Sequence, residues 1–298
     1  MLRILFLFLP IVGCCIHPGS RITYEFSGGR LGDNLLVYVN TLYLSYKYKI
    51  PILYKPFEYS DSLYLHKINS TPKSKFFQTI ILDKNNIERI QEIISVNLPF
   101  LLVVPWGLDT KTNLQEKKFK ELVNDHIKPL KTLNTIKPEE KSKSIALHFR
   151  EGGGFDPNGW HRYFPLKCPS IYYYVDCLNY ISKKIKNSKI HCHIFTDHNS
   201  PKDLADSLKK NIQDPNNFTF TYREKANHHN KNVLEDLFSM PNFDILIRPQ
   251  SAYSLTAEYL GNFNMVFEPI ESIFENDKSI ITKILIKTPK KNIWFYTR

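Results

Sequence analysis

The chain has 298 residues, of which 42% are apolar and 13% aromatic. This composition excludes an intrinsically disordered chain, and the length is sufficient for two domains with their own cores. The formal net charge is +11. A positive net charge favours anionic partners such as nucleotides, nucleic acid or acidic glycans. Lysines spread over solvated faces would give the same net charge without such a partner.

The first 19 residues resemble a targeting or anchoring segment. The sequence MLRILFLFLPIVGCC has one basic residue, an apolar run, and then small residues and cysteines, which is the outline of a secretory signal peptide. The run is too short to span a bilayer as a helix, and IVGC at 11–14 also resembles the bacterial lipobox. An ordinary buried first strand is the alternative. We expect a leader over 1–19 and a location at a membrane, in the secretory pathway or in the cell envelope, the cytoplasmic face included.

The first half of the chain predicts alternating strands and helices. Residues 21–26 alternate as in a strand, the turn SGGRLGDN follows at 27–34, and residues 35–44 carry apolar side chains at helical spacing. Further elements are expected as strands at 50–54, 77–82 and 100–104, and as helices at 86–96 and 114–130. Strand, glycine turn, helix and strand open a βαβ unit. The turn lacks the lysine of a P-loop and the order GxGxxG, so a nicotinamide cofactor is only weakly supported.

The second half repeats this order after a polar segment at 132–143, which is the expected linker. Strands are predicted at 145–150, 189–197, 218–222 and 243–247, and helices from Ser170, at 235–240 and at 251–260. Two successive α/β units predict two Rossmann-like domains that face each other across a cleft, one over 20–140 and one over 141–298.

The segment SIALHFREGGGFD at 144–156 is the most informative part of the chain. A buried strand runs into three consecutive glycines, and Arg150 falls at the end of that strand, where open α/β sheets bind ligands. Arginine offers a planar fork of donors that suits phosphate, and glycines let the backbone approach a bound group. A strand end with a surface arginine and a flexible loop is the alternative.

Four segments carry a resemblance to a known family. They are GGRLGDN at 28–34, HFREG at 148–152, FTDH at 195–198, and DLFSM at 236–240 with QSAYSLTAEYL at 250–260. Together they resemble the glycine turn, the H-x-R-x-G motif, the F-S/T-D-D segment, and the D-L-x-x-M segment with its following helix in the fucosyltransferase superfamily. These two-domain enzymes of GT-B type include α-1,2-, α-1,6- and protein O-fucosyltransferases. The segments occur in the family's order and span most of the chain.

The resemblance implies a glycosyltransferase, inverting and independent of metal, that moves a sugar to a hydroxyl of a glycan or protein. Fucose from GDP-fucose is the first candidate, and no further cofactor is expected. Arg150 would grip the diphosphate, where negative charge builds as it leaves. The other expected donor-binding residues are His148, Gly152, Asp197, Asp236, Ser251 and Ser254, and the expected glycine-turn residues are Gly28, Gly29, Gly32 and Asn34.

Several roles stay open at this point. Glu151, expected beside Arg150 in catalysis, is one candidate general base, with Asp156 and His161 as the others. Ser251 would donate to phosphate at the start of a helix, a ready anion site, or would only cap that helix. Two further histidines share a strand face and are expected to be buried side chains rather than ligands of a metal shared with Asp197; they are His191 and His193.

Two other classes of function are alternatives. The sequence departs from the family pattern at Glu151, in place of a second arginine, at Gly153, in place of an aspartate, and at Gln250, in place of an asparagine. These departures fit a noncatalytic relative that binds a glycan or a nucleotide sugar. A nucleic-acid-binding protein would fit the charge, but the chain has no RNP-like, helix-turn-helix or zinc-finger pattern, so nucleic acid is not expected as a partner.

Overall fold

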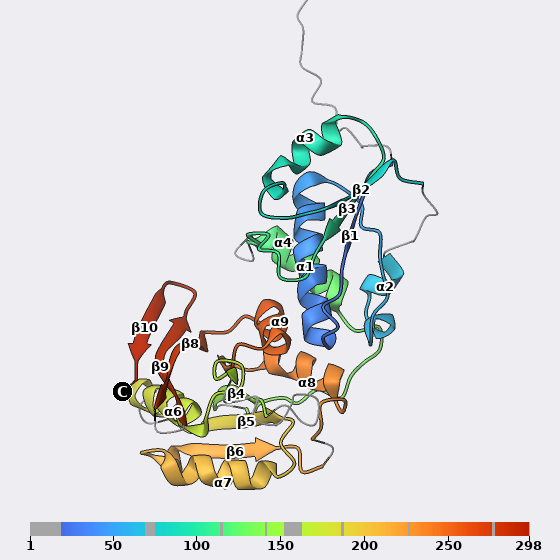
Figure 1. Ribbon diagram of the computed structural model, residues 1–298. Coiled ribbons are helices and arrows are strands. Elements are labelled where there is room, and N and C mark those ends of the chain that lie inside the picture. Colours follow the sequence, from blue (N-terminus) through green and yellow to red (C-terminus); the bar gives the residue numbers. More distant parts are fainter. Residues whose placement is uncertain are drawn as a thin grey trace, which may run out of the picture. The chain divides into compact units, whose positions relative to one another are not determined.

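The computed structural model describes residues 19–68, 75–113, 116–140, 142–151, 163–185, 188–225, 227–275 and 278–297, whose strands form two sheets (Figure 1). The chain divides into two compact units. Unit 1 consists of Met1–Phe26, Val37–Lys55 and Asn69–Asn113, and unit 2 of Ser27–Leu36, Pro56–Ile68 and Leu114–Arg298. The leader predicted at 1–19 lies outside the described residues except for Gly19, as do Gly152, Gly153, Asp156 and His161.

Unit 1 contains a parallel sheet in the order β1-β3-β2, made of β1 (Arg21–Tyr24), β3 (Phe100–Val104) and β2 (Gln78–Ile81). Helix α1 (Leu31–Tyr48) contributes Tyr38, whose ring meets Tyr24 edge to face at 5.8 Å. A 3-10 turn, η2 (Ile87–Arg89), leads into α3 (Ile90–Ser95). These elements confirm the strands predicted near 21–26, 77–82 and 100–104 and the helix predicted over 86–96.

The strand predicted at 50–54 is wrong. Only Ile52 forms an isolated bridge there, with Ile22, and Leu53 donates its amide to the Ile22 carbonyl at 2.7 Å. Pro51 has no N–H to donate, so a longer ladder cannot continue through this segment.

Unit 2 contains a longer sheet in the order β10-β9-β8-β7-β4-β5-β6. Strands β4 (Lys143–Phe149), β5 (Ile190–Thr196), β6 (Phe218–Tyr222), β7 (Ile245–Ile247) and β8 (Met265–Glu275) run parallel, and β9 (Lys278–Lys287) and β10 (Asn292–Tyr296) extend the sheet antiparallel. Because β4 pairs with β5 on one side and β7 on the other, the strand order reverses at β4. Such a switch point is where open α/β sheets bind ligands, at the carboxyl ends of the strands.

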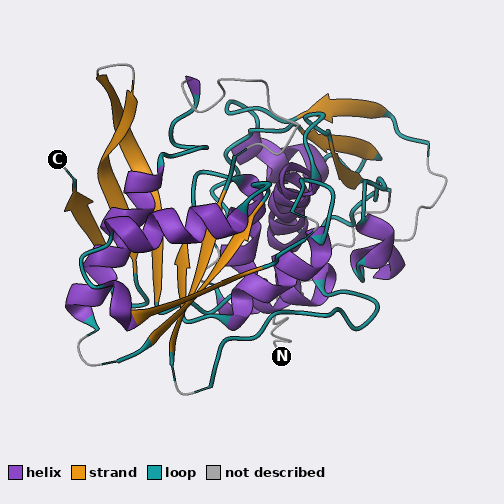
Figure 2. Ribbon diagram, turned by 90° about the horizontal axis from the view of Figure 1, so that it is seen from below, coloured by secondary structure: helices purple, strands orange, loops and turns teal. Residues whose placement is uncertain are grey.

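Unit 2 also contains helices, some of which lie along its sheet (Figure 2). They are η1 (Ser60–Ser62), α2 (Leu65–Ile68), α4 (Lys117–Ile127), α6 (Ile171–Lys184), α7 (Pro201–Asn211), η3 (Pro215–Asn217), α8 (Val233–Ser239), η4 (Met240–Asn242) and α9 (Ala252–Leu260). Helix α6 buries Tyr174 and Leu178 against Ile145 and Leu147 of β4 in the core of the unit. Ser170 precedes α6 as predicted, although its side chain makes no capping hydrogen bond within the described part of the chain.

The sequence expectations for unit 2 hold for β4, β5, β6, β7, α6, α8 and α9. The boundary predicted near residue 140 stays a prediction, because the two units interleave along the chain. In the described parts of the chain, no helix is long and apolar enough to cross a membrane.

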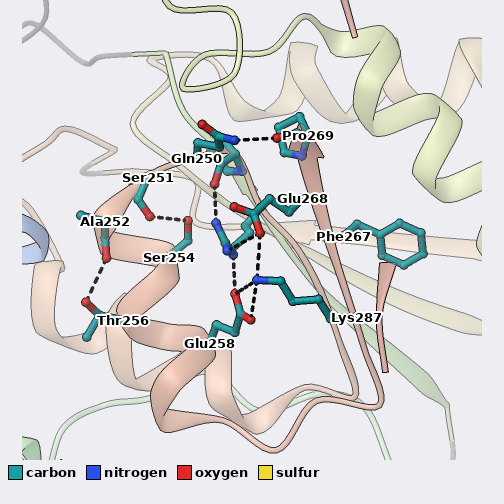
Figure 3. Close-up of polar contacts among 12 residues, drawn as sticks. Gln250, Ser251, Ala252, Ser254, Thr256, Glu258, Phe267, Glu268, Pro269 and Lys287 are labelled. Atoms are coloured by element: carbon teal, nitrogen blue, oxygen red, sulfur yellow. Dashed lines mark hydrogen bonds and ion pairs between the residues drawn. The ribbon is translucent and has the colours of Figure 1, made fainter. Parts of the chain in front are cut away.

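A buried cluster of charges holds the start of α9 on the sheet (Figure 3). Arg248 follows β7 directly, and its side chain is 2% exposed. Its Nε lies 2.7 Å from Glu258 of α9 and its Nη2 lies 2.8 Å from Glu268 of β8, and Lys287 of β9 pairs with both carboxylates at 3.0 and 2.8 Å. The guanidinium also donates to the Pro249 carbonyl at 3.1 Å. The cluster therefore fixes the backbone that leads into α9.

We expect Arg248→Met to lower the free energy of unfolding by about 3–5 kcal/mol, because it leaves two buried carboxylates with one cation. Denaturant unfolding followed by tryptophan fluorescence measures the change. The matched control is Glu271→Gln, which breaks the exposed pair with Lys283 and should cost less than about 1 kcal/mol. Equal losses in the two variants would show that the cluster does not hold the fold.

Candidate functional site

His148 and Arg150 mark the carboxyl end of β4 at the switch point. His148 is buried, its carbonyl accepts the Tyr174 hydroxyl at 3.0 Å, and its ring lies 5.7 Å from that of Tyr253 in α9. Burial lowers the pKa of His148 to about 3, with further lowering by Arg150, Arg30 and Arg248. The imidazole is therefore neutral at pH 7, and the charges of three arginines help to keep it so.

Arg30 is a candidate site residue that the sequence analysis did not single out. It belongs to the glycine turn, between Gly29 and Leu31, yet its charge depresses the pKa of His148 together with that of Arg150. Two arginines that are far apart in the sequence thus raise the positive potential at one place. The sequence signal that could have identified Arg30 is an arginine within a glycine turn, because the backbone conformation of such a turn does not require a charged side chain.

Gly32 lets the glycine turn reach the amino end of α9. A Cβ on Gly32 would lie 2.6 Å from the Cα of Tyr253 and 2.9 Å from the carbonyl carbon of Ala252, so glycine is required at this point. Gly32 is in the first turn of α1, and Tyr253 and Ala252 are in the first turn of α9. The amino ends of two helices therefore meet, and each carries a partial positive charge with unpaired backbone N–H groups.

The rest of the glycine turn is held by its own polar groups. Gly28 has a φ of 80°, a left-handed conformation that favours glycine, and Gly29 donates its amide to the Ser27 hydroxyl at 3.0 Å. The side-chain amide of Asn34 donates to the Gly29 carbonyl at 3.5 Å, while its buried Oδ1 has no hydrogen-bond partner among the residues that the structure describes. Asn34 therefore closes the turn, and its contact with a ligand stays a prediction.

The two serines of α9 have different environments. Ser251 is the buried N-cap residue, but its side chain makes no capping hydrogen bond within the described residues. Ser254 is fully buried and directs its hydroxyl to the Ser251 carbonyl at 3.4 Å (Figure 3). The Ser251 hydroxyl at the amino end of α9 is thus not used to cap the helix, whereas the Ser254 hydroxyl is used inside it.

Asp197 and Glu151 connect the ends of neighbouring strands. The amide of Glu151, just after Arg150, donates to the Asp197 carboxylate at 2.8 Å. The exposed carboxylate of Glu151 lies 3.7 Å from Nε2 of His198. Asp197 thus orients the backbone beside Arg150, and its predicted contact with the donor is still a prediction.

Asp236 lies on α8, near the end of β6. Its carboxylate forms an ion pair with Nε of Arg223 at 2.8 Å, and burial raises its pKa to about 6 even though Arg223 acts to lower it. The Nη2 of Arg223 is buried and finds no hydrogen-bond partner in the described part of the chain. The first turn of α9 is tied to this helix because the Tyr253 hydroxyl donates to the Val233 carbonyl at 2.6 Å.

The paired histidines of β5 are part of the protein interior. His191 and His193 both contact the Thr221 hydroxyl of β6, at 2.7 and 2.8 Å, and burial lowers the pKa of His193 to about 3. These contacts support their interpretation as buried histidines. Across the described residues, no three His, Cys, Asp or Glu side chains gather as a metal site.

A cavity of about 640 Å³ opens beside Arg150 within unit 2. Its walls come from the end of β4, the start of α6, and the facing ends of β8 and β9. Its volume is within the usual range for ligand pockets of about 300–1,000 Å³.

Comparisons with known proteins bear on the fold. No family model and no curated protein matches the sequence. Among solved structures, a mutant of Arabidopsis thaliana FUT1 in complex with GDP is similar, with a TM-score of 0.54 and 11% identity over 83% of this chain and 70% of that one. POFUT1 in complex with GDP-fucose gives a TM-score of 0.49 and 11% identity over 83% and 95% of the two chains. The fucosyltransferase NodZ from Bradyrhizobium gives 0.47 and 10% over 94% and 99%.

At this level of identity, the likeness to FUT1 shows a shared fold. It confirms the α/β, GT-B-like fold class expected from the sequence. The four motifs therefore occur in a chain that shares its fold with FUT1.

Proposed function

We propose that the chain is a glycosyltransferase that binds a nucleoside-diphosphate sugar, with GDP-fucose as the first candidate, and transfers the sugar to a hydroxyl group. The observation that supports this most is the position of Arg150 at the switch point of the sheet, where Gly32 of the glycine turn also meets the first turn of α9 through close packing and Arg30 of the same turn acts with Arg150 to lower the pKa of His148. The similar FUT1 structure is a complex with GDP. We propose that the reaction inverts the sugar carbon and needs no metal ion.

The chemistry requires positive groups where the diphosphate leaves. Donors fixed beside the β-phosphate before the reaction lower the barrier, because they stabilise the charge that develops there. Arginine is well suited, since its hydrogen bonds to phosphate are charge-assisted and bidentate. Arg150 would take this role, with amides at the start of α9 and the Ser251 hydroxyl beside it. Arg30 would supply the second positive group where Glu151 stands in place of the family's second arginine.

The remaining expected site residues have complementary roles in this proposal. Glu151 is the proposed general base, since its carboxylate is exposed directly beside Arg150. Asp236 and Asp197 are proposed to contact the nucleoside on the β5–β6 side of the site. Neutral His148 would support the arginines without adding a competing charge. The leader over 1–19 and a membrane-associated or secretory location belong to the same proposal.

Donor binding tests the arginines. We expect Arg150→Ala and Arg30→Ala each to weaken GDP binding by about 10- to 100-fold, because a hydrogen bond to a charged group contributes about 1.5–3 kcal/mol. Isothermal titration calorimetry with GDP measures the affinity, and UDP tests the base preference. Arg89→Ala is the matched control, because that exposed arginine pairs only locally with Glu92 in unit 1. GDP affinity that is unchanged in all three variants would contradict the proposed site.

Turnover tests Glu151. We expect Glu151→Gln to keep its affinity for GDP within about twofold and to lose about 100-fold or more of its rate of GDP release from GDP-fucose, because a positioned base contributes at least this much. A coupled assay of free GDP measures the rate. A wild-type chain that binds GDP but releases none from GDP-fucose would instead favour the noncatalytic relative.

A further inference from the structure

A largely buried ion pair, Arg223 with Asp236, lies at the carboxyl end of β6, on the edge where open α/β sheets bind ligands. Arg223 follows β6 directly, and Asp236 is on α8. Nε of Arg223 lies 2.8 Å from the Asp236 carboxylate, and the two side chains are 22% and 17% exposed. The pair is therefore mostly withdrawn from water, while the carboxylate keeps enough exposed surface to contact a ligand.

The charge of Asp236 depends on Arg223. Burial and the neighbouring carboxylate of Glu235 raise the pKa of Asp236 to about 6, and the charge and hydrogen bond of Arg223 act in the opposite direction. In the described part of the chain, Arg223 is the only cation that pairs with this carboxylate, and its buried Nη2 has no hydrogen-bond partner there. Removal of either charge would thus leave the other one buried and unbalanced.

The other residues packed around the pair supply no positive charge that could replace Arg223. His193 of β5 is buried and neutral at pH 7, because burial lowers its pKa to about 3 and Arg223 contributes to the lowering. Tyr253 of α9 is also uncharged, since burial raises its pKa well above the usual value and Asp236 raises it further. A change at residue 223 therefore acts directly on Asp236.

We infer that Arg223 is a positioning residue of the proposed donor site, which keeps the Asp236 carboxylate charged and in place so that it holds the nucleobase at neutral pH and releases it in acid. The inference rests on the proposed function, in which Asp236 contacts the nucleoside. A carboxylate accepts hydrogen bonds and donates none, so it favours a base whose edge carries N–H groups, as that of guanine does. A protonated Asp236 would instead present a donor on one oxygen and lose its attraction to Arg223.

The direction of the pH effect follows from the pKa of Asp236, which is about 6. Above this pH the carboxylate is charged and the affinity for the donor is complete, and the affinity is lost as the pH falls through 6. Without an arginine at residue 223, burial and Glu235 would act unopposed. The pKa of Asp236 would then rise, and the donor would be released at a higher pH.

The test follows the binding of GDP-fucose by isothermal titration calorimetry between pH 5 and pH 8. GDP-fucose is used in place of GDP because a terminal phosphate itself titrates near pH 6. We expect the wild type to lose about tenfold of its affinity between pH 7.5 and pH 5, since only the charged form of Asp236 binds. The midpoint should rise by at least about one pH unit in Arg223→Gln and stay near that of the wild type in Arg223→Lys, which keeps the charge.

Asp236→Asn and Arg89→Gln are the matched controls. Asparagine does not titrate, so Asp236→Asn should bind GDP-fucose weakly and equally at every pH. Because this variant keeps the shape of the side chain, it decides the inference even if Arg223→Gln fails to fold. Arg89→Gln removes an exposed arginine that pairs with Glu92 in unit 1, and it should keep the wild-type profile.

Three results would overturn the inference. A loss of affinity in Arg223→Gln that is equal at every pH, with the midpoint unchanged, would give Arg223 a role in the fold alone. A pH dependence that persists in Asp236→Asn would assign the titration to another group. A wild type that binds GDP-fucose equally at pH 5 and pH 8 would show that Asp236 does not hold the donor, and it would leave the proposed function intact. Failure of the wild type to bind GDP-fucose at any pH is the separate result that refutes the proposed function.

Discussion

The candidate site depends on the close contact between Gly32 and the first turn of α9. A side chain at residue 32 would meet the backbone of Tyr253, so any larger residue would push the glycine turn away from α9. With glycine there, Arg30 acts on the end of β4, and the amino ends of two helices come together. The left-handed backbone conformation of the turn is enough to explain a glycine at residue 28. The packing of Gly32 against α9 is what explains how the turn contributes the charge of Arg30.

Positive groups near the switch point lie in two different environments. Arg248 is buried and balanced by Glu258 and Glu268, so its charge maintains the fold and fixes the entry to α9. Arg30 and Arg150 are half-buried, and both lower the pKa of His148 at the end of β4. Arg150 also lines the cavity of unit 2.

Much of the fold could be predicted from the sequence, because buried strands are continuous apolar runs and the turns between them carry glycine or polar residues. The prediction failed at 50–54, where Pro51 interrupts the ladder, and it did not extend to β8, where the register shifts after Pro269 and the alternation is lost. In the site, Arg150 was predictable from its place at a strand end. Arg30 was not, because the effect of its charge on His148 joins residues that are far apart in the sequence, and local patterns do not contain such effects.

The most direct measurement is a crystal structure of the chain with GDP bound. We expect the β-phosphate to lie within hydrogen-bond distance of the guanidinium groups of Arg150 and Arg30 and of the backbone amides at the start of α9, with the nucleobase against the Asp236 carboxylate. A phosphate bound away from these arginines, or a nucleobase bound away from Asp236, would contradict the account.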